Sequence, residues 1–173
     1  MERLFRVQME ADLRNQSLAR SVAAAYASEF DPTVDELTEI KTAVSEAFSN
    51  AVIHGYPEEE QHEGIVEMEF ATAPGATLII KVRDTGVGIE NIARAMEPLF
   101  TTDTGDERSG MGFTVMESFM DKIKVDSKVG EGTAVTMIKK LDTYDAYDAY
   151  DACDECDGCG EEDDSGSGYD GIQ

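Results

Sequence analysis

The feature that most constrains the fold is a stretch of helical periodicity over residues 34–56 that carries polar side chains along one edge. Its apolar residues recur at the three- and four-residue spacing of a helix that packs on a core. They are Val34, Leu37, Ile40, Val44, Phe48 and Val52. Glu46, Asn50 and His54 follow one another at four-residue intervals and therefore share a neighbouring stripe. The sequence predicts one helix with a packing face and a polar edge.

Both ends of this helix carry stop signals. Thr33 and Glu36 have the spacing of a capping box, in which each side chain accepts a hydrogen bond from the other residue's backbone N–H. Gly55 and then Pro57 end the helix. The polar edge leaves two interpretations open, because its residues suit either a solvated surface or a chemical site. We assign His54 a structural role at the helix end.

Composition limits the partners that the chain can have. The 173 residues, 41% of them hydrophobic, suffice for one core, and the formal net charge is -23. Residues 142–173 hold 12 acidic and no basic residues, and the part before them is also acidic. Because nucleic acids and anionic membranes reward clustered Lys and Arg, we expect neither as a direct partner. A protein partner with a basic surface is more compatible with this charge.

No targeting or membrane segment is evident. The chain has no apolar run of about 18 residues, and its first residues lack the apolar centre of a signal peptide. All three cysteines lie beyond residue 150, so the expected core needs no disulfide. We expect a cytoplasmic protein.

The remaining elements follow from the same periodicities. The expected order is strand 4–9, helix 17–30, helix 33–55, strands 65–70 and 77–83, short helices 91–96 and 111–119, and a hairpin of 123–129 and 133–141. This order predicts one α/β domain over residues 1–141, a two-layer sandwich with a mixed, mainly antiparallel sheet and its helices on one face. Residues 142–173 repeat Tyr-Asp-Ala and are poor in aliphatic side chains, so we expect a disordered acidic tail. Its Cys153, Cys156 and Cys159 lack an obvious fourth zinc ligand.

Two glycine-rich motifs interrupt the periodic segments. Residues 84–88, Asp-Thr-Gly-Val-Gly, follow a strand but match neither the P-loop nor the Rossmann fingerprint, and alone they are also compatible with a simple turn. Gly110 and Gly112 precede a helix, whose N-terminus suits a phosphate, although a flexible linker is the alternative. The aperiodic segment 98–112 predicts a functional loop.

Taken together, these elements resemble the ATP-binding domain shared by gyrase, Hsp90, histidine kinases and MutL-type mismatch-repair proteins, the GHKL or Bergerat fold. Glu46 and Asn50 are similar to its first box, residues 84–88 to its second, Gly110 and Gly112 to its third, and residues 130–133 to its closing turn.

A closer resemblance is to the anti-sigma serine kinases of sporulating bacteria, and among them to the anti-sigma F factors. The segments that carry it are residues 36–42, 50–56, 98–102 and 107–113. It covers residues 1–141 and does not include the tail.

The resemblance implies that the protein binds Mg-ATP, transfers the γ-phosphate to a serine of an anti-anti-sigma protein, and as a homodimer holds a sigma factor inactive. An alternative is an ATP-dependent sigma-binding module without significant kinase activity. A histidine kinase is less favoured, because neither His54 nor His62 lies on an expected dimerisation helix. A gyrase-like or Hsp90-like machine would need transducer domains for which we expect no residues.

The resemblance also implies roles for single residues. Glu46 would act as general base and Arg108 as the cation on the γ-phosphate, while Asn50 would bind Mg²⁺. Asp84 would accept from the adenine amino group. Its companions at the base would be Gly86, Gly88 and Thr133.

Further residues would contact the phosphates or a partner. The closing loop would offer hydroxyl and amide donors from Thr101, Thr102, Ser109, Gly110, Met111 and Gly112. Arg14 and Arg20 on the first helix are candidate contacts for an acidic surface of a partner, or they are merely solvated.

Overall fold

A computed structural model describes residues 4–57, 63–97 and 110–142. By compactness the chain divides into Met1–Thr143 and Tyr144–Gln173, and the described residues all belong to the first unit. The disorder expected for the tail, and its three cysteines, lie outside the described residues.

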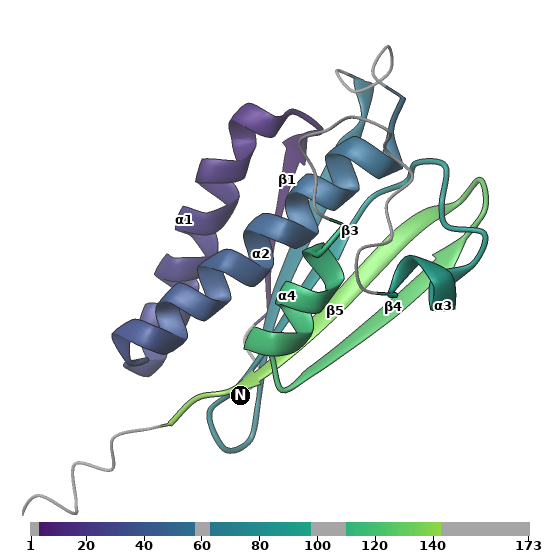
Figure 1. Cartoon of the computed structure of the whole chain (residues 1–173). Coiled ribbons are helices and arrows are strands. Elements are labelled where there is room, and N and C mark those ends of the chain that lie inside the picture. The colour runs from purple at the N-terminus through teal and green to yellow at the C-terminus, as the bar shows by residue number, and fades with distance from the viewer. Residues whose placement is uncertain (1–3, 58–62, 98–109, 143–173) are drawn as a thin grey trace, which may run out of the picture. The chain divides into compact units, whose positions relative to one another are not determined.

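The described part of the chain forms one sheet with helices on one of its faces (Figure 1). The strands are β1 (Phe5–Glu10), β2 (Ile65–Ala73), β3 (Thr77–Arg83), β4 (Lys122–Lys128) and β5 (Gly132–Lys140). The helices are η1 (Leu13–Asn15), α1 (Gln16–Ala27), η2 (Ser28–Phe30), α2 (Val34–Gly55), α3 (Ile92–Ala95) and α4 (Gly112–Phe119). The expected two-layer α/β sandwich is confirmed.

The order of the strands in the sheet is β1-β2-β3-β5-β4, and each of its neighbouring pairs is antiparallel. A parallel pair, which a mixed sheet would include, does not occur among the described strands. Because β5 lies between β3 and β4, the residue that follows β3 and the first residues of β5 meet at the same end of the sheet. This end carries the candidate site described below.

Helix α2 begins and ends as its sequence predicts. The Thr33 Oγ1 accepts from the Glu36 N–H at 3.2 Å, and the Glu36 Oε2 accepts from the Thr33 N–H at 2.7 Å, so the capping box is confirmed. The predicted apolar face is wrong at one residue, Val34, which is 81% exposed. Val34 is the first residue of the helix, and burial of its apolar face is complete only from Ile40 onward.

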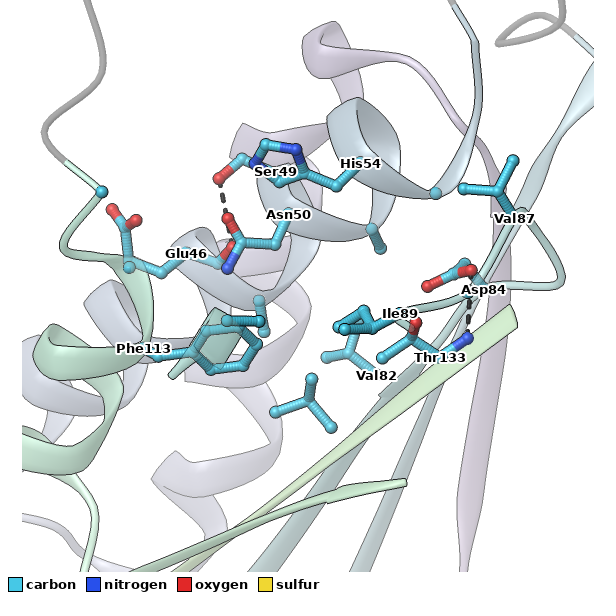
Figure 2. Close-up of a pocket in the computed structure, with 18 of the residues that line it drawn as sticks. Glu46, Ser49, Asn50, His54, Val82, Asp84, Val87, Ile89, Phe113 and Thr133 are labelled. Carbon is cyan, nitrogen blue, oxygen red and sulfur yellow. Dashed lines mark hydrogen bonds between the residues drawn. The ribbon is translucent and has the colours of Figure 1, made fainter. Parts of the chain in front are cut away.

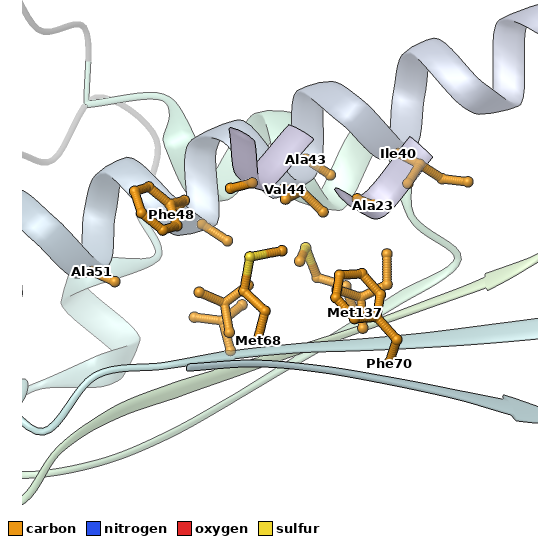
Figure 3. Close-up of a cluster of buried hydrophobic side chains, with 14 of the residues drawn as sticks. Ala23, Ile40, Ala43, Val44, Phe48, Ala51, Met68, Phe70 and Met137 are labelled. Atoms are coloured by element: carbon orange, nitrogen blue, oxygen red, sulfur yellow. The ribbon is translucent and has the colours of Figure 1, made fainter. Parts of the chain in front are cut away.

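The core lies between α2 and the sheet. Figure 3 shows Phe48 of α2 above Met68 and Phe70 of β2, all of which have no exposed surface. Alanines such as Ala23 and Ala43 are buried where α1 packs beside α2, and their small side chains let the two helices approach closely. Burial of one such large apolar side chain contributes about 1.5–3 kcal/mol, so these contacts hold α2 on the sheet.

The start of α2 is also joined to the chain that follows β5. Glu36 is 7% exposed, and its Oε1 accepts from the Asp142 N–H at 2.7 Å. Burial alone would raise the pKa of Glu36, but hydrogen bonds from the backbone of Asp142 and from Thr33 outweigh it and hold the pKa below its usual range. Nearby, the Lys139 Nζ lies 2.6 Å from the Glu39 Oε2. Among the described residues, no helix is long and apolar enough to cross a membrane.

Candidate functional site

A cavity of about 750 Å³ lies between α2 and the sheet end where β3 and β5 meet. Its walls come from α2, from the loop after β3, from α3 and from the start of α4. A cavity of this size suits a small organic ligand such as a nucleotide. Figure 2 shows it with polar side chains from α2 on one side and Asp84 and Thr133 on the other.

The polar edge of α2 faces this cavity. Glu46, Asn50 and His54 all line it, so the stripe seen in the sequence lies on the cavity wall. The Glu46 and Asn50 side chains converge on Gly112, since a methyl group at Gly112 would lie 3.1 Å from the Glu46 Oε2 and 3.0 Å from the Asn50 Nδ2. Gly112 therefore leaves space in front of both polar groups.

Gly112 is also the first residue of α4. The residue before it, Met111, makes no side-chain capping hydrogen bond, so no side chain at that position covers the first N–H groups of the helix. The N–H groups at a helix N-terminus and the positive end of the helix dipole favour an anion at this point. The oxygen-bearing edge of α2 and the N-terminus of α4 thus lie beside one another on the cavity wall.

The opposite end of the cavity is built around Asp84, which directly follows β3 and is 3% exposed. Its Oδ1 accepts from the Gly86 N–H at 3.0 Å and from the Thr133 N–H at 3.2 Å. The Oδ2 lies on the cavity side (Figure 2). Burial raises the pKa of Asp84, and the N–H donors of Gly86 and Thr133 counter this in part.

Two glycines let the loop after Asp84 approach its neighbours. A Cβ on Gly86 would lie 1.8 Å from the Gly55 carbonyl oxygen, which accepts from the Val87 N–H at 2.8 Å. Gly88 has a φ of 73°, which favours glycine, and a Cβ there would lie 2.2 Å from the Lys128 carbonyl oxygen. These close approaches fix the loop between the end of α2 and the β4–β5 hairpin.

Apolar side chains line the space between the two polar ends. They include Val82, Ile89, Phe113 and Val135. A planar apolar ring packs well against such a surface, while polar groups at its edges fix its orientation.

The structure brings most of the predicted site residues together. Those that line the cavity are Glu46, Asn50, Asp84, Gly88, Gly110, Met111, Gly112 and Thr133. Gly86 supports Asp84 from behind. The predicted roles of Thr101, Thr102, Arg108 and Ser109 lie outside the described residues. Arg20 is exposed on α1, whereas Arg14 lies in η1, before the helix on which it was expected. Arg14 is also exposed, with its Nε 2.8 Å from the Asp12 Oδ2.

Sequence reasoning missed several lining residues. His54, which the sequence assigned to a structural role, lines the cavity, although its spacing from Asn50 was a signal. Arg94 of α3 and Leu13 and Gln16 near the start of α1 also line it. They belong to segments distant from α2 in sequence, so no local pattern indicated their place.

The chain was compared with known proteins and solved structures. Residues 9–139 match the model of the histidine kinase-like ATPase domain. The chain belongs to this family. Within the family, it is 52% identical over 135 residues to the anti-sigma F factor of Clostridium kluyveri, an alignment that covers 78% of this chain and 92% of that protein. It is 50% identical over 141 residues to the anti-sigma F factor of Anoxybacillus flavithermus, covering 82% and 94%. The chain is therefore grouped with the anti-sigma F factors, as its motifs predict.

Solved structures agree on the fold of this histidine kinase-like ATPase domain. The RsbU and RsbW domains of Rv1364c from Mycobacterium tuberculosis superpose with a TM-score of 0.58 at 19% identity, covering 80% of this chain and 32% of theirs. Full-length ShkA in complex with AMPPNP gives a TM-score of 0.53 at 18% identity, covering 79% and 31%. At these identities the likeness supports the fold alone, and it confirms the predicted fold class.

The donor groups at the α2 end are compatible with Mg²⁺. Glu46 and Asn50 offer carboxylate and amide oxygens, and Gly112 leaves space in front of them. Mg²⁺ prefers oxygen ligands, keeps several waters and is commonly bound by one or two side chains together with phosphates. No group of three or more His, Cys, Asp or Glu side chains is arranged to hold a metal in the part of the chain that the structure describes.

Proposed function

We propose that this protein is a cytoplasmic serine protein kinase that uses Mg-ATP to phosphorylate a serine of an anti-anti-sigma protein, and that it also binds and inhibits a sporulation-type sigma factor as a homodimer. The observation that carries the kinase proposal is the position of Glu46. Its carboxylate lies one helical turn before Asn50 and beside the N-terminus of α4, where the γ-phosphate of a bound ATP would be expected.

The proposal assigns the ends of the cavity to the two ends of ATP. The adenine lies between the apolar walls with its amino group at Asp84, and the triphosphate extends toward Asn50 and the first N–H groups of α4. Gly86 and Gly88 keep the loop in place, while Gly110, Met111 and Gly112 lie where backbone donors would reach the phosphates. Arg108, Thr101, Thr102 and Ser109 would add donors from the loop before α4.

The transfer step needs a base and charge neutralisation. The serine Oγ forms a bond to the γ-phosphorus as the bond from that phosphorus to the β,γ-bridging oxygen breaks, and ADP leaves. The serine hydroxyl proton passes to the Glu46 carboxylate. Mg²⁺, held by the Asn50 side chain and the phosphates, would supply charge neutralisation, and Arg108 would add a second positive charge.

The kinase proposal is tested by Glu46→Gln, which keeps the size of the side chain and removes its basicity. Radiolabelled ATP, purified anti-anti-sigma protein and sigma factor of the F type are mixed with each variant. We expect phosphoserine formation to fall by about 100-fold or more, in the range assigned to general-base catalysis, while sigma binding is kept. Glu117→Gln, on the exposed side of α4, is the matched control and is expected to behave as the wild type.

Two outcomes of this assay would overturn the kinase proposal. Absence of phosphoserine with the wild-type protein, together with ATP-dependent sigma binding, would leave a binding module. Equal rates for Glu46→Gln and the wild type would remove Glu46 from the transfer step.

The partner-binding part of the proposal rests on the relatives' names and on exposed charge. The curated relatives are anti-sigma F factors, which supports a sigma factor as partner. Arg20 is exposed on α1, where it is available to an acidic surface. Arg14 already pairs with Asp12, so we assign it the smaller contribution of the two. Arg20→Glu is expected to weaken complex formation, measured by size-exclusion chromatography with light scattering, which also reports the dimer.

A further inference from the structure

The Ser127 hydroxyl on β4 makes three hydrogen-bonding contacts next to the Asp84 end of the cavity. Its Oγ accepts from the Ile89 N–H at 2.8 Å, donates to the Gly132 carbonyl oxygen at 3.0 Å and lies 2.9 Å from the Thr133 Oγ1. Ile89 and Thr133 line the cavity, whereas Ser127 does not. Ser127 therefore acts on the cavity wall from behind.

The single proton of this hydroxyl determines how Thr133 is oriented. A serine hydroxyl has one donor hydrogen and two acceptor lone pairs. If the Ser127 proton points to the Gly132 carbonyl, the two lone pairs accept from the Ile89 N–H and from the Thr133 hydroxyl, and every contact has one hydrogen. The opposite arrangement would leave the Ser127 and Gly132 oxygens 3.0 Å apart without a hydrogen between them. Thr133 must then donate to Ser127, and only its lone pairs can face the cavity.

Asp84 presents the same polarity beside Thr133. The Oδ1 is occupied by the Gly86 and Thr133 N–H groups, and the Oδ2 faces the cavity (Figure 2). The two side chains thus offer acceptors at this edge of the cavity and no donor. The 6-amino group of adenine has N–H donors for such acceptors, whereas a 6-oxo group in the same place meets lone pairs, and the N–H that a 6-oxo purine carries is one ring position away, on N1.

We propose that Ser127 is a positioning residue that fixes Thr133 as an acceptor, so that the cavity selects purines with a 6-amino group over purines with a 6-oxo group. This inference rests on the proposed binding of ATP and adds its base specificity. A site that would leave buried polar groups unpaired discriminates strongly against the wrong ligand. The contribution of Ser127 to this discrimination is the strength of one hydrogen bond.

The test compares ATP with ITP, which carries the 6-oxo group together with an N1–H but lacks the 2-amino group of GTP. The affinity of the full chain for each nucleotide is measured by isothermal titration calorimetry with Mg²⁺ present. In Ser127→Ala the Thr133 hydroxyl is free to rotate and donate to a 6-oxo group. We expect the preference for ATP over ITP to fall by about 5- to 10-fold, the factor of one neutral hydrogen bond, mainly because ITP binds better.

Two variants serve as matched controls. Ser127→Thr keeps the hydroxyl and is expected to keep the wild-type preference. Ser118→Ala removes a hydroxyl on α4 that bonds only to the Thr114 carbonyl among the described contacts, and it is expected to change neither affinity.

Thr133→Val separates this role from a loss of local structure. If Ser127 acts through Thr133, adding Ser127→Ala to Thr133→Val leaves the ATP-to-ITP preference unchanged. The single Thr133→Val variant also decides the polarity if Ser127→Ala fails to fold. Loss of an acceptor lowers the preference for ATP, whereas loss of a donor would raise it.

The outcomes distinguish this inference from the proposed function. Equal weakening of ATP and ITP by Ser127→Ala would give Ser127 a structural role only and overturn the inference, as would a raised preference in Thr133→Val. In either case ATP binding by the wild type leaves the proposed function standing. If the wild type binds neither nucleotide, the proposed function fails and the inference fails with it.

Discussion

Replacement of Asp84 should lower the affinity for ATP and raise the folding stability of the protein. Asp84→Asn keeps the shape of the side chain, and its amide oxygen can still accept from the Gly86 and Thr133 N–H groups. The oxygen on the cavity side, however, becomes an NH₂ donor. A 6-amino group would then meet a donor in place of a carboxylate. We expect ATP affinity to fall by about 10- to 150-fold, the equivalent of one charge-assisted hydrogen bond of about 1.5–3 kcal/mol.

The same substitution should stabilise the nucleotide-free protein. Burial raises the pKa of Asp84 above its ordinary value of 3.8, so folding favours the protonated form. The contribution of protonated Asp84 to the free energy of unfolding is fully present below its unfolded-state pKa. It is lost as the pH rises through its folded-state pKa. Asparagine carries no charge at any of these pH values. The variant should therefore exceed the wild type in free energy of unfolding at pH 7, and the difference should disappear near pH 3.

Two assays on one preparation check this reasoning. Isothermal titration calorimetry gives the affinity for ATP, and urea denaturation without nucleotide gives the free energy of unfolding at both pH values. Arg83→Gln, next to Asp84 on the exposed side of β3, serves as a neighbouring-charge control. An ATP affinity within about 2-fold of the wild type would refute the placement of the base at Asp84. A variant less stable than the wild type at pH 7 would refute the burial argument.

Two further predictions concern Gly112 and Glu36. Gly112→Ala replaces glycine in the first turn of α4 by a better helix former, so stability should hold or rise by up to about 1 kcal/mol, while ATP affinity should fall by about 10-fold, because the new methyl group would lie about 3 Å from Glu46 and Asn50. Thermal unfolding together with calorimetry separates the two effects. Glu36→Gln should destabilise the protein by about 1 kcal/mol at pH 7, because the hydrogen bonds from Asp142 and Thr33 lose a charged acceptor. Since the pKa of Glu36 is lowered on folding, its contribution is present above the unfolded-state pKa and is lost as the pH falls through the folded-state pKa. The difference between variant and wild type in urea denaturation should therefore shrink in acid, and a constant difference would contradict the assignment.

Local patterns predicted the helix that carries the site. The cap at Thr33, the spacing of Glu46 and Asn50, and the glycine at the end of the helix are all set by neighbours in the sequence. The sequence alone could therefore predict α2 and its polar edge. Val34 shows the limit of this reasoning, because periodicity does not say where along a helix the packing begins. The alternation of apolar and polar residues likewise predicted the strands of the sheet.

The sequence alone could predict only part of the Asp84 end of the cavity. The pattern after β3 indicated Asp84, but the order β3-β5-β4 brings Ser127 and Thr133 to it from the far hairpin. Strand order depends on which hydrophobic faces pack together across the whole domain, and a single local pattern does not contain it. The function of the Ser127 hydroxyl follows from three contacts that no spacing in the sequence encodes.

The bond between Glu36 and Asp142 has a practical consequence for the choice of a minimal fragment. Among the described residues, the last strand ends at Lys140 and the last buried side chain is Leu141, so a truncation guided by strand ends or by hydrophobicity would stop there. Such a fragment would end in a carboxylate where the Leu141–Asp142 peptide bond now lies, next to the Glu36 carboxylate. It would also lack the Asp142 N–H that donates to Glu36. Expression boundaries for this domain therefore belong beyond Asp142, where the cap of α2 keeps its donor.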